Sequence, residues 1–304
     1  MKKVLVIGFG SIGKRHVRLL RDMGLLVHVY SRRSFPEEIE YQSLGVALKE
    51  VDPEYVVIAN ETSEHFSTLN TVLSFDVPQV LVEKPLFTFP ETPLDIKISQ
   101  VCVAYNLRFH PLLRQLRSEI EEETVLSVQV YVGQYLPNWR PHQDYRQSYS
   151  VSKALGGGVL RDLSHELDYL NWLFGPWEAL TALGGHYSFL EGDSDDVFCL
   201  LLQMKHCSAV TLQMNYLDRT GRRQVLVNTD HHTYHLDLVQ QKFWVDQESE
   251  VSISVEQDET YLAQHRDMLE NQGRVCCTLS EGKEILRMIY TAEQAAQGQK
   301  WLAR

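Results

Sequence analysis

The sequence predicts an α/β fold in two domains, a parallel sheet covered by helices and then a sheet with two unlike faces. Before residue 110, short apolar runs such as Val4–Ile7 and Tyr55–Ala59 alternate with helical segments. Continuous apolar runs are typical of parallel strands that are buried on both faces. From Val125 onward, apolar and polar residues alternate with a period of two, which indicates half-buried strands. A length of 304 residues suits two domains of ordinary size.

The composition limits the partners of such a protein. A net charge of −11 disfavours nucleic acid and anionic membrane surfaces. No apolar stretch approaches the length of a membrane span, and the first apolar run is too short for a signal peptide. The five cysteines are an odd number without metal-ligand spacing, which indicates reduced thiols. We therefore expect a cytoplasmic protein that binds a small molecule and holds no metal.

A glycine-rich turn follows the first strand directly. The strand Val4–Ile7 runs into the pattern Gly-x-Gly-x-x-Gly, and a helical segment comes next. In a dinucleotide site Gly8 permits a tight turn, Gly10 lets the backbone approach a pyrophosphate, and Gly13 lets the helix pack against the strand. The helix N-terminus then offers free N–H groups to the phosphates. The pattern predicts a Rossmann domain that binds NAD or NADP. The cofactor residues expected here are Gly8, Phe9, Gly10, Ser11, Ile12 and Gly13.

The end of the second strand bears on the choice of cofactor. In a Rossmann domain an acid at this point binds the ribose 2′-hydroxyl, whereas an arginine accommodates a 2′-phosphate. After Leu26–Tyr30 the chain has Ser31, Arg32 and Arg33, with no acid before Glu37. The pair of arginines favours NADP over NAD. The alternative is a solvated basic turn without a ligand.

Two further strands complete the first domain. The strand Tyr55–Ala59 leads into a polar loop that should cap a helix at Thr62 or Ser63. The strand Val101–Tyr105 completes the parallel set, and a helix to about Glu122 leads out of the domain.

A lysine follows the strand between these two. The run Val80–Val82 ends in Glu83, Lys84 and Pro85. Residues at the carboxyl end of a buried strand lie at the ligand crevice of an open α/β sheet. Lys84 is therefore a candidate for the reacting centre, although an ordinary surface lysine is the alternative.

Five segments of this chain together resemble the Gfo/Idh/MocA family of two-domain sugar oxidoreductases, which includes glucose–fructose oxidoreductase and inositol dehydrogenase. The resemblance implies an N-terminal Rossmann domain and a C-terminal α+β domain with an open, mainly antiparallel sheet for substrate binding and oligomerisation. On this basis we expect domains at 1–122 and 123–304. The matching segments are the glycine loop 8–13, Ala59–His65, Glu83–Leu86, Ala104–Asn106 with Arg108, Phe109 and Pro111, and Gly156–Asp168.

The resemblance also implies roles for single residues. Lys84 would bond the reacting oxygen of the substrate, and His165 would carry its proton, because histidine titrates near neutral pH. Asp162 would orient His165 or a substrate hydroxyl. The family usually places its histidine four residues after this aspartate, and here Glu166 stands four after and His165 three after, so Glu166 is a competing candidate. The remaining expected contacts are Asn60, Glu61, His65 and Glu83 at the cofactor and Tyr105 and Arg108 at the substrate.

A loop rich in aromatic and basic residues precedes the triple glycine. Trp139 and Tyr145 alternate with Arg140 and Arg146. Aromatic faces stack on sugar rings or bases, and arginine binds carboxylates or phosphates through two parallel hydrogen bonds. We expect this loop to form a wall of the substrate site. The alternative is a loop that packs its own aromatic rings on the sheet.

The second domain shows further patterns. Asp162 is expected to begin a helix whose core stripe is Leu163, Leu167, Leu170 and Phe174, with Asp162 and His165 on one side of it. Histidines near 231 lack acids at metal-ligand spacing and are expected in a solvated turn. A sheet with one helix-covered face leaves the other free for a partner subunit, so a homodimer or homotetramer is expected.

The function expected from these features is hydride transfer between a nicotinamide and a carbinol or carbonyl carbon of a sugar. The arginines, and a likeness to members linked to bacterial surface-sugar pathways, suggest an acidic or nucleotide-linked sugar. Three alternatives stay open. They are a biliverdin reductase-like enzyme, a family member that cleaves glycosides without net redox change, and a non-catalytic regulator that senses the cofactor.

Overall fold

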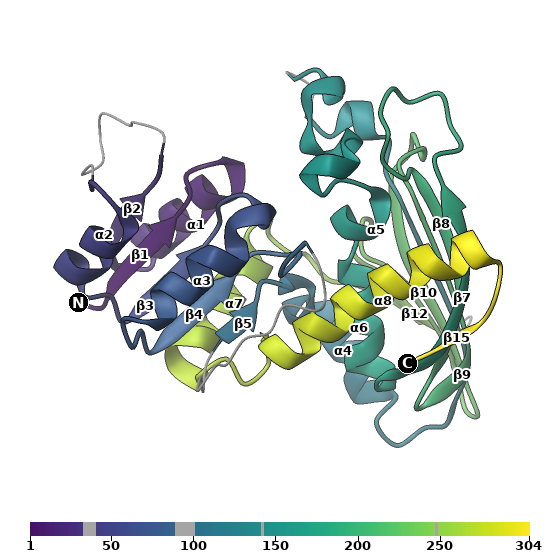
Figure 1. Ribbon diagram of the computed structural model, residues 1–304. Helices are drawn as coiled ribbons and strands as arrows, with labels where there is room; N and C mark the ends of the chain where they lie inside the picture. The colour runs from purple at the N-terminus through teal and green to yellow at the C-terminus, as the bar shows by residue number, and fades with distance from the viewer. Residues whose placement is uncertain (33–40, 89–100, 141–142, 247–248) are drawn as a thin grey trace. The chain divides into compact units, whose positions relative to one another are not determined.

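The computed structural model describes residues 1–32, 41–88, 101–140, 143–246 and 249–304, and it divides into two compact units (Figure 1). Unit 1 comprises residues 1–109 and 257–286, and unit 2 comprises residues 110–256 and 287–304. This division differs from the two contiguous domains expected at 1–122 and 123–304. The reason is that strand β14, Cys277–Thr278, returns to unit 1 and pairs with β5, Val101–Val103.

Unit 1 contains a six-stranded sheet in the order β14-β5-β4-β3-β1-β2. Its first five strands along the chain are parallel, as the sequence predicts, and β14 is antiparallel at one edge. Val4, Leu5 and Val6 are completely buried, which agrees with a sheet covered on both faces. The parallel strands are β1 (Lys3–Ile7), β2 (Leu26–Tyr30), β3 (Tyr55–Ile58), β4 (Gln79–Val82) and β5.

Four α-helices of the described residues belong wholly to unit 1. They are α1 (Ser11–Asp22), α2 (Leu44–Val51), α3 (His65–Leu73) and α7 (Glu259–Asn271). The expected helix cap at Thr62 or Ser63 is wrong. Thr62–Glu64 forms a 3₁₀ turn that continues into α3, so Thr62 and Ser63 are themselves helical, and neither helix start has a side-chain cap bond.

Unit 2 contains a nine-stranded sheet in the order β13-β12-β11-β10-β6-β9-β8-β7-β15. Every neighbouring pair is antiparallel except β6 with β9, which confirms the open, mainly antiparallel sheet. The strands are β6 (Val125–Gly133), β7 (Trp177–Gly185), β8 (Val197–Met204), β9 (Cys207–Asn215), β10 (Arg222–Thr229), β11 (Thr233–Asp237), β12 (Lys242–Val245), β13 (Ser249–Ser252) and β15 (Leu302–Ala303).

The helices of unit 2 lie on one face of this sheet (Figure 1). They are α4 (Pro111–Glu119), α5 (Val159–Asp162), α6 (His165–Phe174) and the part of α8 (Leu279–Gly298) after residue 286. The four residues of the expected core stripe, Leu163, Leu167, Leu170 and Phe174, are all buried, but Leu163 precedes α6 and is not part of it. No helix in the described part of the chain is long and apolar enough to cross a membrane.

The helix expected to begin at Asp162 is wrong in its start. Asp162 is the last residue of α5, and α6 begins three residues later. Between them the backbone hydrogen bonds follow the 3₁₀ pattern, in which an N–H bonds the carbonyl three residues earlier. These bonds run from Ser164 N to Arg161 O and from Glu166 N to Leu163 O, each 3.4 Å. Asp162 and His165 therefore belong to two separate helices and not to one side of a single helix.

Candidate functional site

The glycine loop packs against the loop that follows β3. Gly8 has a φ of +99°, and a Cβ there would lie 2.5 Å from the carbonyl oxygen of Ala59. A Cβ on Gly13 would lie 2.2 Å from the carbonyl oxygen of Gly8. At Gly10 a Cβ would meet nothing within 4 Å, so this backbone faces open space. Two glycines are thus required by packing, and the third leaves room for a ligand.

Helix α1 begins at Ser11, immediately after that open glycine, and has no side-chain cap bond. The first N–H groups of a helix without a cap are available to an anion, and the helix dipole favours negative charge there. The first turn also has no acidic residue that would repel a phosphate. The loop and the helix therefore fit the pyrophosphate of a dinucleotide.

Arg32, at the end of β2, forms ion pairs with two acids from the loop after β3. Its guanidinium lies 3.0 Å from a carboxylate oxygen of Glu61 and 2.6 Å from one of Glu64. The sequence predicted Glu61 at the cofactor but did not predict that these acids meet the arginine expected at the ribose. Arg33 lies outside the described residues.

His65 is buried and contacts the backbone of two loops. Its Nδ1 lies 3.2 Å from the carbonyl oxygen of Pro85 and 3.1 Å from that of Leu86, and its Nε2 lies 3.1 Å from the carbonyl oxygen of Asn60. Burial lowers the pKa of His65 below its usual value of 6.5. His65, expected at the cofactor, joins the loop after β3 to the segment that follows Lys84.

Lys84 lies two residues beyond the carboxyl end of β4, as predicted, and is half-buried. Its backbone N–H donates a 3.1 Å hydrogen bond to Oε2 of Glu83. The other carboxylate oxygen of Glu83 lies 2.8 Å from Nε2 of His16 in helix α1. Lys84 therefore stands on a backbone that a buried carboxylate holds in place.

The two substrate residues expected after β5 are buried. Tyr105 has no exposed surface, and Arg108 is 2% exposed. The guanidinium of Arg108 lies 3.0 Å from Glu281, at the start of α8. Both belong to the interior of unit 1 in this structure, and their contact with a substrate stays a prediction.

In unit 2, Asp162 accepts hydrogen bonds from two tyrosines. The hydroxyl of Tyr149 donates to Oδ1 at 2.8 Å, and that of Tyr216 donates to Oδ2 at 2.7 Å. The ring of Trp139 meets that of Tyr216 edge-on, with centroids 5.3 Å apart. Burial and the Asp162 charge raise the pKa of both tyrosines, so they remain hydroxyl donors at neutral pH.

The neighbours His165 and Glu166 have different surroundings. The side chain of Glu166 is fully buried and forms an ion pair with Nε of Arg223 at 2.8 Å. His165 is half-buried at the first position of α6. The buried ion pair connects α6 to strand β10, so Glu166 has a structural role.

The aromatic and basic loop divides into two parts. Arg146 lies 2.9 Å from Asp144 and 3.2 Å from Glu191, and both acids raise its pKa. The hydroxyl of Tyr145 accepts a 3.2 Å bond from the backbone N–H of Glu191. Arg140 is exposed, and no ion pair is seen for it within the described residues. The sequence predicted the same substrate-binding role for Arg140 and Arg146, but the two differ in their availability to an anion.

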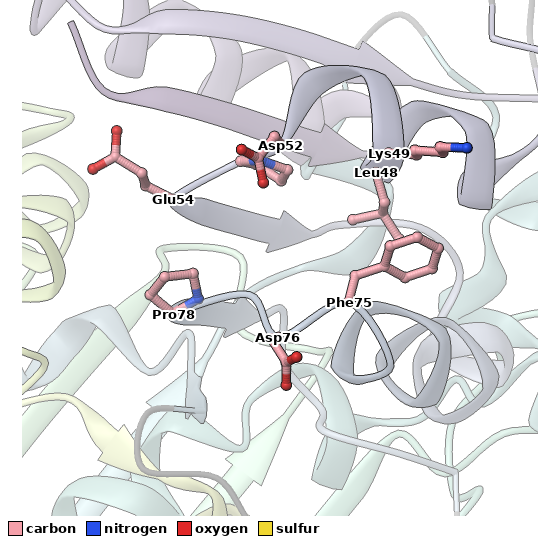
Figure 2. A pocket seen from close by; sticks show the side chains of 8 residues that line it. Leu48, Lys49, Asp52, Glu54, Phe75, Asp76 and Pro78 are labelled. Atoms are coloured by element: carbon pink, nitrogen blue, oxygen red, sulfur yellow. The ribbon is translucent and has the colours of Figure 1, made fainter.

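One hollow in unit 1 lies away from the glycine loop. Figure 2 shows it at the amino ends of β3 and β4, whereas the cofactor is expected at the carboxyl ends of these strands. Its volume is about 380 Å³. Three acids and one lysine line it, which does not fit a dinucleotide pyrophosphate. The lining residues are Leu48, Lys49, Asp52, Pro53, Glu54, Phe75, Asp76 and Pro78.

The described residues contain no group of three or more histidines, cysteines or acids arranged to hold a metal ion. His231 and His232 lie in the turn between β10 and β11. Nδ1 of His232 pairs with Asp246 at 2.9 Å, and this pair raises the pKa of the histidine.

Two family models match most of this chain. The oxidoreductase family with an NAD-binding Rossmann fold matches residues 2–104, and the GFO/IDH/MocA C-terminal domain matches residues 113–241. The chain belongs to the Gfo/Idh/MocA oxidoreductases. It is 25% identical over 149 residues to an uncharacterized oxidoreductase of Synechocystis, a match that covers 47% of this chain and 40% of that protein. The chain thus spans less than half the length of that curated relative.

Several solved structures share the fold over nearly the whole chain. GenD2 from gentamicin A biosynthesis, in complex with NAD, is 19% identical with a TM-score of 0.81, over 100% of this chain and 96% of that one. A levoglucosan dehydrogenase in complex with NADH and levoglucosan is 17% identical with a TM-score of 0.84, over 99% and 98%. At these identities the likeness shows the common fold.

Sequence reasoning missed several residues of the candidate site. Tyr216 follows an alternating strand and has no signal of its own, because its role depends on where Asp162 lies. Arg223 lies in a strand whose sequence pattern does not mark it, and only its ion pair with Glu166 in the structure identifies its role. His16 comes three residues after Gly13 on the buried side of α1, and a histidine at a buried helix position was the one available clue.

Proposed function

We propose that this protein transfers a hydride between the nicotinamide of NAD(P) and a carbinol or carbonyl carbon of an acidic or nucleotide-linked sugar. The observation that carries the proposal is Lys84 at the carboxyl end of β4, in the same unit as a glycine loop that fits a pyrophosphate. The glycine loop and the start of α1 would hold the cofactor, which would supply or accept the hydride when bound. Proton transfer and stabilisation of charge on the substrate are assigned to side chains of this protein.

Lys84 donates a hydrogen bond to the reacting oxygen and stabilises the charge that develops there. His165 takes the proton from that oxygen in oxidation and returns it in reduction. Its competitor Glu166 is occupied by Arg223 in a buried pair, which supports His165 as the proton carrier. Asp162 accepts hydrogen bonds from the hydroxyls of Tyr149 and Tyr216, and in this proposal it also orients His165 or a substrate hydroxyl.

The substrate class rests on the loop before the triple glycine. Arg140 is exposed, and its positive charge lies close enough to Tyr149 to oppose the rise in the pKa of that tyrosine. An arginine beside aromatic rings suits a sugar that carries a carboxylate or a phosphate. Solved proteins of this fold include enzymes named for sugars, which agrees with a sugar substrate.

The preferred cofactor in this proposal is NADP. Arg32 lies at the end of β2, where a 2′-phosphate would be bound. Its ion pairs with Glu61 and Glu64 are exposed, and exposed pairs contribute little to stability. A phosphate of charge near −2 can therefore replace the carboxylates on the guanidinium.

The location and assembly are part of the same proposal. All five cysteines carry free thiols, which supports a cytoplasmic protein. The face of the unit 2 sheet opposite the helices exposes Leu183 on β7 and Leu201 on β8. A second copy covers this face in a homo-oligomer. Light scattering of Leu183→Glu with Leu201→Glu should show a smaller particle than the wild type.

The experiment that tests the function is a panel of sugars, sugar acids and nucleotide sugars, each with NADP and with NAD. Oxidation or reduction is followed by nicotinamide absorbance, and substrate conversion by chromatography. Net absorbance change with an acidic or nucleotide-linked sugar supports the proposal. Conversion of a glycoside without absorbance change would instead support redox-neutral cleavage. Cofactor binding without conversion of any compound would support a regulator.

A further inference from the structure

A chain of four buried side chains runs through the core of unit 1. Oε1 of Glu83 lies 2.8 Å from Nε2 of His16, Nδ1 of His16 lies 2.9 Å from Nε2 of His265, and Nδ1 of His265 lies 2.9 Å from the hydroxyl of Tyr55. The two histidines and the tyrosine have no exposed surface, and Glu83 is 8% exposed. The chain joins α1, α7, β3 and the end of β4.

The direction of the bond between His16 and Glu83 is fixed by the carboxylate, which can only accept, so Nε2–H of His16 is the donor. Burial and the neighbouring His16 lower the pKa of His265 well below its usual value, so His265 is neutral. A neutral imidazole uses one nitrogen as donor and the other as acceptor, so the neutral His265 can accept from the Tyr55 hydroxyl at Nδ1 and donate from Nε2 to Nδ1 of His16. In that arrangement all three bonds point toward the acid.

The chain ends inside the protein. A path that conducts protons must reach solvent, whereas Tyr55 is completely buried and packs in the core with Cys102, Cys276 and Met268. The chain therefore serves to hold groups in place. At its other end is the Glu83 carboxylate, whose second oxygen accepts a hydrogen bond from the backbone N–H of Lys84.

We propose that His16 is a positioning residue for Lys84. By donating to Glu83 it fixes the carboxylate that orients the Lys84 backbone, and it couples that backbone to helix α1, which begins at the glycine loop. The inference rests on the proposed role of Lys84 in catalysis. A buried donor to a carboxylate is a strong contact, because charge-assisted hydrogen bonds are about twice as strong as neutral ones.

The test compares three substitutions at one position. His16→Leu removes both contacts, His16→Gln keeps an N–H donor at the ε position that faces Glu83, and His16→Asn keeps an amide near His265 only. Misplacement of a reacting group by about 1 Å costs about 100-fold in rate, so His16→Leu should lower kcat by about 10- to 100-fold. The KM for cofactor should stay within about twofold. His16→Gln should recover most of the kcat, and His16→Asn should recover less.

Tyr55→Phe is the matched control, because it removes a contact of the same chain at the end remote from Lys84. It should lower the melting temperature and leave kcat unchanged. Cofactor affinity and melting temperature are measured for every variant. Should His16→Leu fail to fold, the isosteric Glu83→Gln replaces it, since a neutral amide loses the charge-assisted bond while it keeps its volume.

Two results would overturn the positioning role. One is a folded His16→Leu protein, or Glu83→Gln in its place, with the kcat of the wild type. The other is an equal loss of kcat in His16→Leu and His16→Gln at equal stability, which would assign the effect to packing. Lys84→Met separates this inference from the proposed function. If Lys84→Met keeps its turnover, the role of Lys84 itself is wrong, and if only Lys84→Met is inactive, His16 alone is misassigned.

Discussion

Nε of Arg223 lies 2.8 Å from Oε1 of Glu166, and the carboxylate of Glu166 has no exposed surface. A buried ion pair resists loss of either partner, because the remaining charge is left without compensation. This relationship separates Glu166 from the neighbouring His165, although sequence spacing alone allows either to be the catalytic group.

The first prediction concerns these neighbours and Lys84. His165→Ala should lower kcat by about two to four orders of magnitude, the usual contribution of general acid–base catalysis, and leave cofactor binding nearly intact. Lys84→Ala should lose as much. The double variant should lose less than the product of the two, because groups that act together are not additive. Steady-state kinetics with the identified sugar measure these effects.

Glu166 supplies the control for that prediction. Glu166→Ala should destabilise the fold by about 3–5 kcal/mol, as expected when one partner of a buried pair is removed. Glu166→Gln, which keeps the shape, should fold and retain turnover. A crippled Glu166→Gln beside a near-normal His165→Ala would place the proton carrier at Glu166.

The second prediction separates two arginines of one loop. Arg140→Ala should raise the KM for an acidic or nucleotide-linked sugar, because removal of a charged hydrogen-bond donor costs about 1.5–3 kcal/mol. Arg146→Ala should change this KM little, since its guanidinium already pairs with Asp144 and Glu191. Equal effects of the two substitutions would show that Arg146 leaves its acids when the substrate binds.

Patterns along the chain predicted the types of strand in the two sheets. Continuous apolar runs marked the parallel strands, and alternation marked the half-buried strands β6 and β9, because burial on two faces or one face sets the pattern directly. The division into units was not predictable in this way. Residues 257–286 return to unit 1 through the pairing of β14 with β5, a contact between segments far apart in the sequence.

The candidate site was predictable only where a residue type and a local pattern coincide. The glycine loop and Lys84 follow from the strand that precedes each of them. The partners of Asp162 do not, because Tyr149 and Tyr216 come from a loop and a strand end that meet only in the folded unit. Likewise, nothing local in the sequence shows that Arg32 meets Glu61 and Glu64.

The third prediction is a dependence of stability on pH that comes from Asp195. Burial raises the pKa of this carboxyl to about 6 in the folded protein, against 3.8 in the unfolded chain. Between these pH values the unfolded chain releases the proton while the folded protein keeps it, so Asp195 lowers stability as pH rises and its full cost is present above pH 6.

Asp195→Asn removes this titration and keeps an oxygen that can accept the N–H of Leu160, which now bonds Oδ2 of Asp195 at 3.1 Å. The stability of the variant relative to the wild type should be greater at about pH 7.5 than at about pH 4.5, by about 1–2 kcal/mol. Urea unfolding at both pH values measures this difference. A difference that is constant with pH would show that Asp195 has an ordinary pKa.

The fourth prediction concerns cofactor preference. The proposed function places the 2′-phosphate of NADP at Arg32, whose guanidinium forms ion pairs with Glu61 and Glu64. Arg32→Ala should weaken the binding of NADP much more than that of NAD, because only NADP carries the phosphate.

The two acids give a second, opposite arm of the same test. Glu61→Gln with Glu64→Gln removes two negative charges that compete with the phosphate for Arg32, so NADP should bind more tightly than to the wild type. The affinity for NAD should change less, because its 2′-hydroxyl is uncharged. Fluorescence titration with both reduced cofactors at low and high salt measures the four constants, and salt should weaken the NADP effect because the charges are exposed. A wild type that binds NAD more tightly, and loses NAD affinity when the acids become amides, would show instead that Glu61 and Glu64 bind the ribose hydroxyls and that Arg32 only positions them.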